Sequence, residues 1–225
     1  MIQNKWVLIL DFDSTLISTE SIDLLSEVCL KSRQDSISTI SKIKDLTNKG
    51  MIGDITFYDS LIQRLKYLDI KNCHLDQLVE KLFLLISPTI KKNQAWLKKN
   101  RMDIFIFSGG FKRIIDPIAF SLGLKIDQVY GNDFTFSNDG SINGVNFKNP
   151  LSQSNGKFLL AKNLDIKKKI IMVGDGMTDS EIKQLGSETV FIAYTENIYR
   201  NEVVDIADYK AETFDDVIHF IESIK

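Results

Sequence analysis

The sequence predicts a doubly wound α/β protein with a mainly parallel, Rossmann-like sheet and a small helical cap inserted after the first strand. Two observations predict the sheet: short apolar runs recur along the chain, and helical patterns separate them. Runs that are apolar on both faces are typical of strands buried in a parallel sheet. A third observation predicts the cap, because this alternation stops for a long stretch after the first run.

The elements of the predicted core follow one another along the chain. The expected strands are "WVLIL" (6–10), "DIFIF" (103–107), "KIIMV" (169–173) and "TVFIA" (189–193). The expected helices lie near 90–99, 111–122, 156–164, 177–185 and 213–223. In such a sheet, ligands bind at the carboxyl ends of the strands.

The stretch from about residue 19 to residue 87 contains no convincing strand. Helical spacing recurs there, at Ile37, Ile40 and Ile43 and again at Phe57, Leu61, Leu65 and Leu68. We therefore expect a helical cap at 19–87 and a core made of 1–18 and 88–225. A shorter interruption of the strand–helix alternation, at 130–147, has alternating apolar residues around "NDG" and "NG", which predicts a β-hairpin.

The composition limits the partners and the location. Lys and Arg total 28 against 30 for Asp and Glu, and a net charge of −2 gives no global field that would attract a nucleic acid or an anionic membrane. Cys29 and Cys73 form neither a disulfide framework nor a zinc motif, and the apolar runs are too short to span a membrane. We expect a cytoplasmic monomer or homodimer that binds a small molecule.

Two acids, Asp11 and Asp13, follow the first strand in "VLILDFDSTL". Carboxylates this close repel each other unless a cation or a shared proton lies between them, and a divalent metal is a natural solution. Taken alone, the stretch is also compatible with an ordinary strand end that leads into a turn.

The second and third predicted strands also end in residues suited to phosphate chemistry. Ser108, Gly109 and Gly110 bring a hydroxyl and an accessible backbone, a plausible phosphate cradle, although any tight strand-to-helix turn would accept them. Asp175 and Asp179 lie in "GDGMTD". Oxygen ligands from Asp11 and Asp175 suit Mg²⁺.

Lys157 opens the helix that precedes the third strand. Its ammonium could neutralise a phosphate and a crowded carboxylate, but by position alone a solvated lysine is the better explanation.

Taken in order, "DFDSTL", "FSGG", Lys157 and "GDGMTD" resemble the four signature motifs of the phosphatases in the haloacid dehalogenase-like superfamily. The resemblance covers essentially the whole chain and implies the α/β core, the cap and phosphoryl transfer. Within the superfamily the cap resembles that of the phosphoserine phosphatases. That similarity implies that Glu20 binds a substrate amino group, that Arg64 binds its carboxylate, and that Met51 and Phe57 line the pocket.

The residues themselves give modest support for this assignment. Arg64 lies seven residues after Phe57, in or beside the apolar stripe of its helix, where a cation needs an anionic partner. An arginine whose head reaches water at the edge of the stripe remains an alternative, as does a plain helix-start acid for Glu20.

The resemblance also implies the catalytic roles. Asp11 is the expected nucleophile, and Asp13 the acid that protonates the leaving oxygen and then activates water. Mg²⁺ is expected at Asp11, Asp175 and the main-chain carbonyl of Asp13. Ser108, the Gly109 amide and Lys157 are expected to hold phosphate, with Asp179 and Thr178 in support. Thr178 stands where many relatives have asparagine, and the surroundings of Lys157 lack the familiar "KG" order.

Other functions remain open at this point. The enzyme could hydrolyse another small phosphomonoester or pass phosphate to a second alcohol as a phosphotransferase. A non-catalytic phosphate sensor is the alternative from another class, and Asp13 argues against it, because binding alone needs no general acid.

Overall fold

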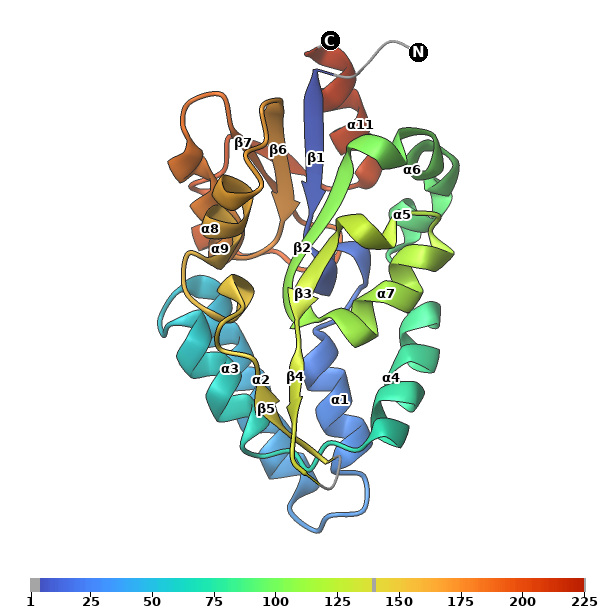
Figure 1. Cartoon of the computed structure of the whole chain (residues 1–225), viewed down its shortest axis with the longest axis vertical. Helices are drawn as coiled ribbons and strands as arrows, with labels where there is room; N and C mark the ends of the chain where they lie inside the picture. The colour runs from blue at the N-terminus through green and yellow to red at the C-terminus, as the bar shows by residue number, and fades with distance from the viewer. Residues whose placement is uncertain (1–4, 139–140, 225) are drawn as a thin grey trace.

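A sheet of six parallel strands forms the centre of the molecule, whose computed structural model describes residues 5–138 and 141–224. The strand order is β3-β2-β1-β6-β7-β8. The strands are β1 Trp6–Leu10, β2 Ile104–Phe111, β3 Val129–Asn132, β6 Lys169–Gly174, β7 Val190–Tyr194 and β8 Tyr209–Ala211. All the pairs are parallel, and Figure 1 shows the arrows of β1 and β6 pointing the same way, with helices on both faces of the sheet.

The central strand β1 is buried on both of its faces. Leu8 and Leu10 pack into one hydrophobic cluster, while Val7 and Ile9 pack into the other, on the opposite side of the sheet. Complete burial of such a side chain stabilises the fold by about 1.5–3 kcal/mol. The prediction of a parallel sheet covered on both faces is confirmed.

The helices of the core lie between successive strands, except the last one, which follows β8. They are α5 Pro88–Lys92, α6 Gln94–Asn100, α7 Lys112–Ser121, α8 Gly156–Asn163, α9 Met177–Ser180, α10 Asn201–Val204 and α11 Phe214–Ser223. Short turns add η1 Phe12–Leu16, η2 Arg101–Asp103, η3 Ile126–Gln128, η4 Pro150–Ser152 and η5 Glu181–Leu185. Among the described residues, none of these or the remaining helices has the length and apolar character needed to cross a membrane.

Of the helices between β1 and β2, the first four form the helical cap: α1 Ser21–Cys29, α2 Ser36–Ile52, α3 Phe57–Leu65 and α4 Asn72–Leu84. They extend beyond the carboxyl ends of the strands (Figure 1). Gly50 lets α2 approach α3 closely, because a Cβ there would lie 2.8 Å from Ser60 Oγ. The division of the chain at 19 and 87 stays a prediction.

The structure corrects the interpretation of residues 130–147. Residues 129–132 form β3, which pairs in parallel with β2, so they belong to the main sheet. The hairpin is shorter than predicted and consists of β4 Phe134–Phe136 and β5 Ile142–Val145. β8 was not predicted from the sequence, and the second strand is longer than predicted, since β2 continues to Phe111, four residues beyond the expected end.

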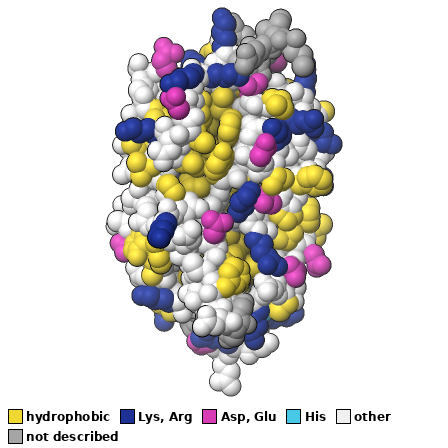
Figure 2. Space-filling model, in the orientation of Figure 1, with side chains coloured by type: hydrophobic (Ala, Val, Ile, Leu, Met, Phe, Trp, Pro, Cys, Tyr) yellow, Lys and Arg dark blue, Asp and Glu magenta, His cyan; other side chains and the backbone are white. Residues whose placement is uncertain are grey.

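Surface charges of both signs are mixed. On the face shown in Figure 2, Lys and Arg side chains are scattered among Asp and Glu and among hydrophobic residues. This distribution agrees with the small net charge of −2.

Candidate active site

The carboxyl end of β1 places Asp11 at the edge of the sheet. Its amide donates a 2.9 Å hydrogen bond to the carbonyl of Val173 in β6, and its Oδ1 accepts one of 2.7 Å from the amide of Phe12. The chain then makes the tight turn η1, in which Ser14 has a left-handed φ of 50°. Burial raises the pKa of Asp11 to about 7, against the opposing effect of Lys157.

Asp13 lies within the η1 turn, and its carboxylate is held by the first residue of α1. Ser21 donates to it twice, from its amide at 2.8 Å and from its hydroxyl at 3.1 Å. Burial, followed by the charges of Glu20 and Asp11, raises the pKa of Asp13 well above its usual value. A raised pKa favours the protonated carboxyl, the form that a general acid needs.

Lys157 lies between two carboxylates at the centre of the site. Its ammonium is 2.9 Å from Asp11 Oδ1 and donates a hydrogen bond to Asp179. Burial alone would lower the pKa of Lys157, but Asp11 and Asp179 outweigh it and raise the pKa. The alternative of a solvated lysine is wrong, since only 4% of this residue is exposed.

The loop before α8 determines where Lys157 lies. Asn155 takes a left-handed φ of 58°, and Gly156 packs so tightly that a Cβ there would lie 2.3 Å from the carbonyl oxygen of Pro150. These backbone restrictions fix the start of α8, whose second residue is Lys157, and Asp11 and Asp179 then hold the ammonium.

The expected phosphate cradle lies at the end of β2. Ser108 is buried, and its hydroxyl oxygen accepts a 2.9 Å hydrogen bond from the amide of Gly110. A Cβ on Gly109 would come within 2.2 Å of the Phe57 ring, which belongs to the cap. Glycine at 109 therefore lets the cap lie directly on this strand end.

Three buried acids form a cluster that could hold a cation. Asp11, Asp175 and Asp179 each offer a carboxylate oxygen within 4.8 Å of the others. Burial raises the pKa of Asp175 well above its usual value, although Arg200 counteracts it. Such a group of oxygen ligands fits a divalent metal. Asp179 belongs to this cluster, although it was not among the predicted metal ligands. Asp13, which was predicted to bind the metal through its main-chain carbonyl, contributes no carboxylate to the cluster.

A small cavity of about 20 Å³ brings most of the predicted residues together. Ten of them line it: Asp11, Asp13, Glu20, Met51, Phe57, Arg64, Ser108, Gly109, Lys157 and Thr178. Asp175 and Asp179 belong to the acid cluster with Asp11. The core therefore supplies most of the acids, a lysine and the strand-end backbone, while residues 19–87 supply Glu20, apolar residues and Arg64.

The guanidinium of Arg64 is buried, so the alternative in which its head reaches water is wrong. Its Nε donates to the carbonyl of Ser60 at 3.3 Å and its Nη1 to the hydroxyl of Thr47 at 3.1 Å. Thr47 in turn donates a 2.6 Å hydrogen bond to Asp23. Burial lowers the pKa of Arg64, while Glu20 and Asp23 oppose that change.

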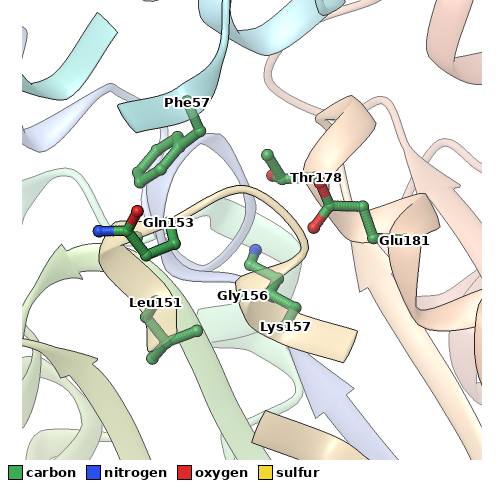
Figure 3. A pocket seen from close by; sticks show the side chains of 8 residues that line it. Phe57, Leu151, Gln153, Gly156, Lys157, Thr178 and Glu181 are labelled. Carbon is green, nitrogen blue, oxygen red and sulfur yellow. The ribbon is translucent and has the colours of Figure 1, made fainter. Parts of the chain in front are cut away.

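A second cavity, also of about 20 Å³, adjoins the first at Phe57, Gly109, Lys157 and Thr178. Figure 3 shows the Lys157 ammonium pointing into it, with Glu181 and Thr178 on one side and Phe57 above. Burial raises the pKa of Glu181 to about 7.

Several residues of the site were missed by the sequence analysis. Thr15 donates a 3.4 Å hydrogen bond to Asp175, Asp23 and Thr47 support Arg64, and Arg200 forms an ion pair with Asp175. Asp23 has a detectable signal, since it lies one helical turn after Glu20. Arg200 has none, because it belongs to no motif and precedes a helix of four residues.

Comparisons with known proteins agree with this geometry. A family model described as haloacid dehalogenase-like hydrolase matches residues 7–182. Phosphoserine phosphatase of Campylobacter jejuni subsp. doylei is 30% identical over 210 residues, which cover 90% of this chain and 95% of that protein. The Homo sapiens phosphoserine phosphatase is 29% identical over 94% of this chain and 91% of its own.

Solved structures show the same similarity. A phosphoserine phosphohydrolase-like protein from Francisella tularensis subsp. tularensis SCHU S4 superposes with a TM-score of 0.86 at 33% identity, covering 98% of this chain and 100% of the other. A substrate-bound phosphoserine phosphatase complex has a TM-score of 0.75 at 22% identity, covers 98% of this chain and 99% of its own, and shows the shared fold.

Proposed function

Because the chain belongs to the haloacid dehalogenase-like hydrolases and is a phosphoric monoester hydrolase, we propose that its substrate is O-phosphoserine, which it converts to serine and phosphate. One observation carries the choice of substrate. Glu20 and the buried Arg64 line the same small cavity as Asp11 and Asp13. An acid and a guanidinium together complement the ammonium and carboxylate of an amino acid ester. The product serine would place the reaction in amino-acid biosynthesis.

In the first step, a carboxylate oxygen of Asp11 attacks phosphorus in line with the seryl oxygen. The new bond joins Asp11 to phosphorus, the bond from phosphorus to the seryl oxygen breaks, and Asp13 gives its proton to that oxygen. Serine leaves, and an aspartyl-phosphate remains.

In the second step, Asp13 accepts a proton from the water that attacks phosphorus. The bond between Asp11 and phosphorus breaks, and inorganic phosphate is released with both acids restored. Ser108 and the Gly109 amide hold the phosphate oxygens throughout, and the Lys157 ammonium offsets their charge. Mg²⁺, held by Asp11, Asp175 and the carbonyl of Asp13, would offset the repulsion between the carboxylates and the phosphate.

The cap, residues 19–87, closes over the site in this proposal. Phe57 lies against Gly109, and the ring of Tyr58 in α3 lies 5.3 Å from that of Phe147 in the core. These contacts support a closed cap that excludes bulk water while the ester reacts.

The test is Mg²⁺-dependent phosphate release from a panel of phosphomonoesters, repeated with R64M. We expect O-phosphoserine to be the best substrate and R64M to raise its KM by about 10–100-fold, since a charge-assisted hydrogen bond is worth ~1.5–3 kcal/mol. Turnover of propyl phosphate, which has no carboxylate, should stay within about twofold.

R33M is the matched control, because Arg33 pairs with Asp35 on the exposed surface of the cap. A preference for another ester, or R64M with an unchanged KM for O-phosphoserine, would refute the substrate. Release of phosphate that falls when homoserine is added, with phosphohomoserine formed instead, would indicate a phosphotransferase.

A further inference from the structure

Arg200 is a buried cation that belongs to none of the four motifs. It lies between β7 and α10, is 7% exposed, and reaches back to the carboxyl end of β6. A buried guanidinium is stable only where acids and hydrogen-bond acceptors surround it. Its partners therefore indicate what it does.

One nitrogen of the guanidinium holds Asp175. Nη1 donates a hydrogen bond to the Asp175 carboxylate at Oδ2 and another, 3.2 Å long, to the main-chain carbonyl of the same residue. The other carboxylate oxygen accepts a 3.4 Å hydrogen bond from Thr15. Asp175 is thus restrained at both side-chain oxygens and at its backbone.

The other nitrogen faces Glu20. Nη2 lies 3.6 Å from Glu20 Oε1, is buried, and has no hydrogen-bond partner within the described part of the chain. The same Glu20 oxygen accepts a 2.8 Å hydrogen bond from the hydroxyl of Ser14. Arg200 and Ser14 therefore act together on the orientation of this acid.

Only a side chain with two separate donor nitrogens can hold one acid and face a second one in this way. A guanidinium offers several N–H groups in one rigid plane, whereas an ammonium is a single point of charge. Without Arg200, the carboxylates of Asp175 and Glu20 would face each other unscreened, and like charges this close repel.

We propose that Arg200 is a positioning residue that orients the metal-binding carboxylate of Asp175 and the substrate-binding carboxylate of Glu20 through one guanidinium. Partners that hold a ligating carboxylate typically change metal affinity by about 10–100-fold when removed. The part that concerns Glu20 rests on the proposed function. The part that concerns Asp175 does not depend on any substrate.

The first measurement is titration calorimetry with MgCl₂ on the substrate-free, full-length protein. We expect R200Q to weaken Mg²⁺ binding by at least about tenfold. The control R33Q, which removes an exposed guanidinium bonded to Asp35 at 2.7 and 2.9 Å, should bind Mg²⁺ as the wild type does. R200Q with unchanged or tighter Mg²⁺ binding would overturn the proposal, because tighter binding would mean that the guanidinium competes with the metal.

The second measurement compares O-phosphoserine with 3-phosphooxypropionate, an ester that lacks only the amino group, at saturating Mg²⁺. In R200Q we expect the ratio of the two kcat/KM values to fall by about tenfold, mostly through a higher KM for O-phosphoserine. An unchanged ratio would contradict the role at Glu20. A wild-type enzyme without preference for the amino ester would instead refute the proposed function and leave the Mg²⁺ result standing.

R200K keeps the positive charge but lacks the planar guanidinium with its several donors, so it tests which of the two matters. It also provides a second variant if R200Q is poorly folded. Its single ammonium keeps the charge but cannot hold both acids, so we expect it to rescue at most one of the two properties. A variant R200K that matches the wild type in both would show that charge alone suffices and would overturn the proposal.

Discussion

Asp13 is the residue whose surroundings say most about its chemistry. Two hydrogen bonds from Ser21 fix its carboxylate, while burial and the neighbouring acids Glu20 and Asp11 raise its pKa well above the usual value. The raised pKa favours the protonated form, which a general acid needs before it can deliver a proton to a leaving oxygen.

Replacing that proton donor tests the assignment. D13N keeps the size and most of the hydrogen bonding but cannot exchange a proton, so we expect kcat to fall by about 10²–10⁴-fold in steady-state phosphate release. D116N, which alters a partly exposed acid paired with Lys112 on α7, should leave kcat unchanged. Undiminished turnover by D13N would disprove the acid–base role.

Residue type and order in the sequence predicted which residues form the site better than they predicted which side chains contact those residues. Asp11, Asp13, Ser108, Asp175 and Asp179 all follow predicted strands, so topology alone brings them to one edge of the sheet. The partners were not predictable in the same way, because a contact such as that between Arg200 and Asp175 depends on how an irregular segment folds back. The structure showed that Arg64 is buried, which the spacing of its helix had left open.

Among the elements, β2 of the core and α3 of the cap meet where the Phe57 ring covers Gly109. An aromatic ring next to a strand end leaves no space for an added methyl group. The contact also connects the cap to the expected phosphate cradle, since Gly109 follows Ser108 directly.

We therefore expect G109A to displace the cap. A Cβ within 2.2 Å of the ring forces Phe57 away, so amide hydrogen exchange in α3 should increase and kcat/KM for O-phosphoserine should fall by at least about tenfold. In G109A/F57A the clash is removed, and exchange in α3 should return to that of F57A alone. Equal exchange in G109A and the wild type would show that the contact does not hold the cap.

The elements also show where periodicity is informative and where it is not. Long buried runs such as β1 and β6 were predicted to within one residue, because they are apolar on both faces. β3 and β8 span four and three residues, too short for any period to be recognised, and β3 continues almost directly into the hairpin that follows it. The parallel pairing that separates β3 from the hairpin is a long-range contact that local pattern does not encode.

At the scale of the whole molecule, the cluster of buried acids links stability to pH. The folded-state pKa of Asp11 is raised to about 7, and those of Asp13 and Asp175 are also raised, whereas the unfolded values lie near 3.8. The folded protein thus binds more protons than the unfolded chain between these limits, so stability falls as pH rises through this window.

Without metal, we expect the Tm to be higher at pH 5.5 than at pH 8, and a difference of 1 kcal/mol corresponds to about 2–4 °C for a chain of this size. Millimolar Mg²⁺ should raise the Tm more at pH 8 than at pH 5.5, because it binds the ionised acids of the folded state. Differential scanning fluorimetry in the presence of EDTA or MgCl₂ measures both effects. A metal-free Tm that increases from pH 5.5 to pH 8 would contradict the assignment of raised pKa values.

The position of β1 in the sheet also has a consequence for how the chain is made. β1 is synthesised before the strands that flank it, which are β2, beginning at residue 104, and β6, beginning at residue 169. The amide of Asp11 finds its acceptor, the carbonyl of Val173, only when β6 has been added. Until then the run "WVLIL" has an unpaired edge, the kind of apolar segment that aggregates. On the ribosome, Asp11 therefore emerges before both strands that flank β1 and is fixed in place only after β6 has followed.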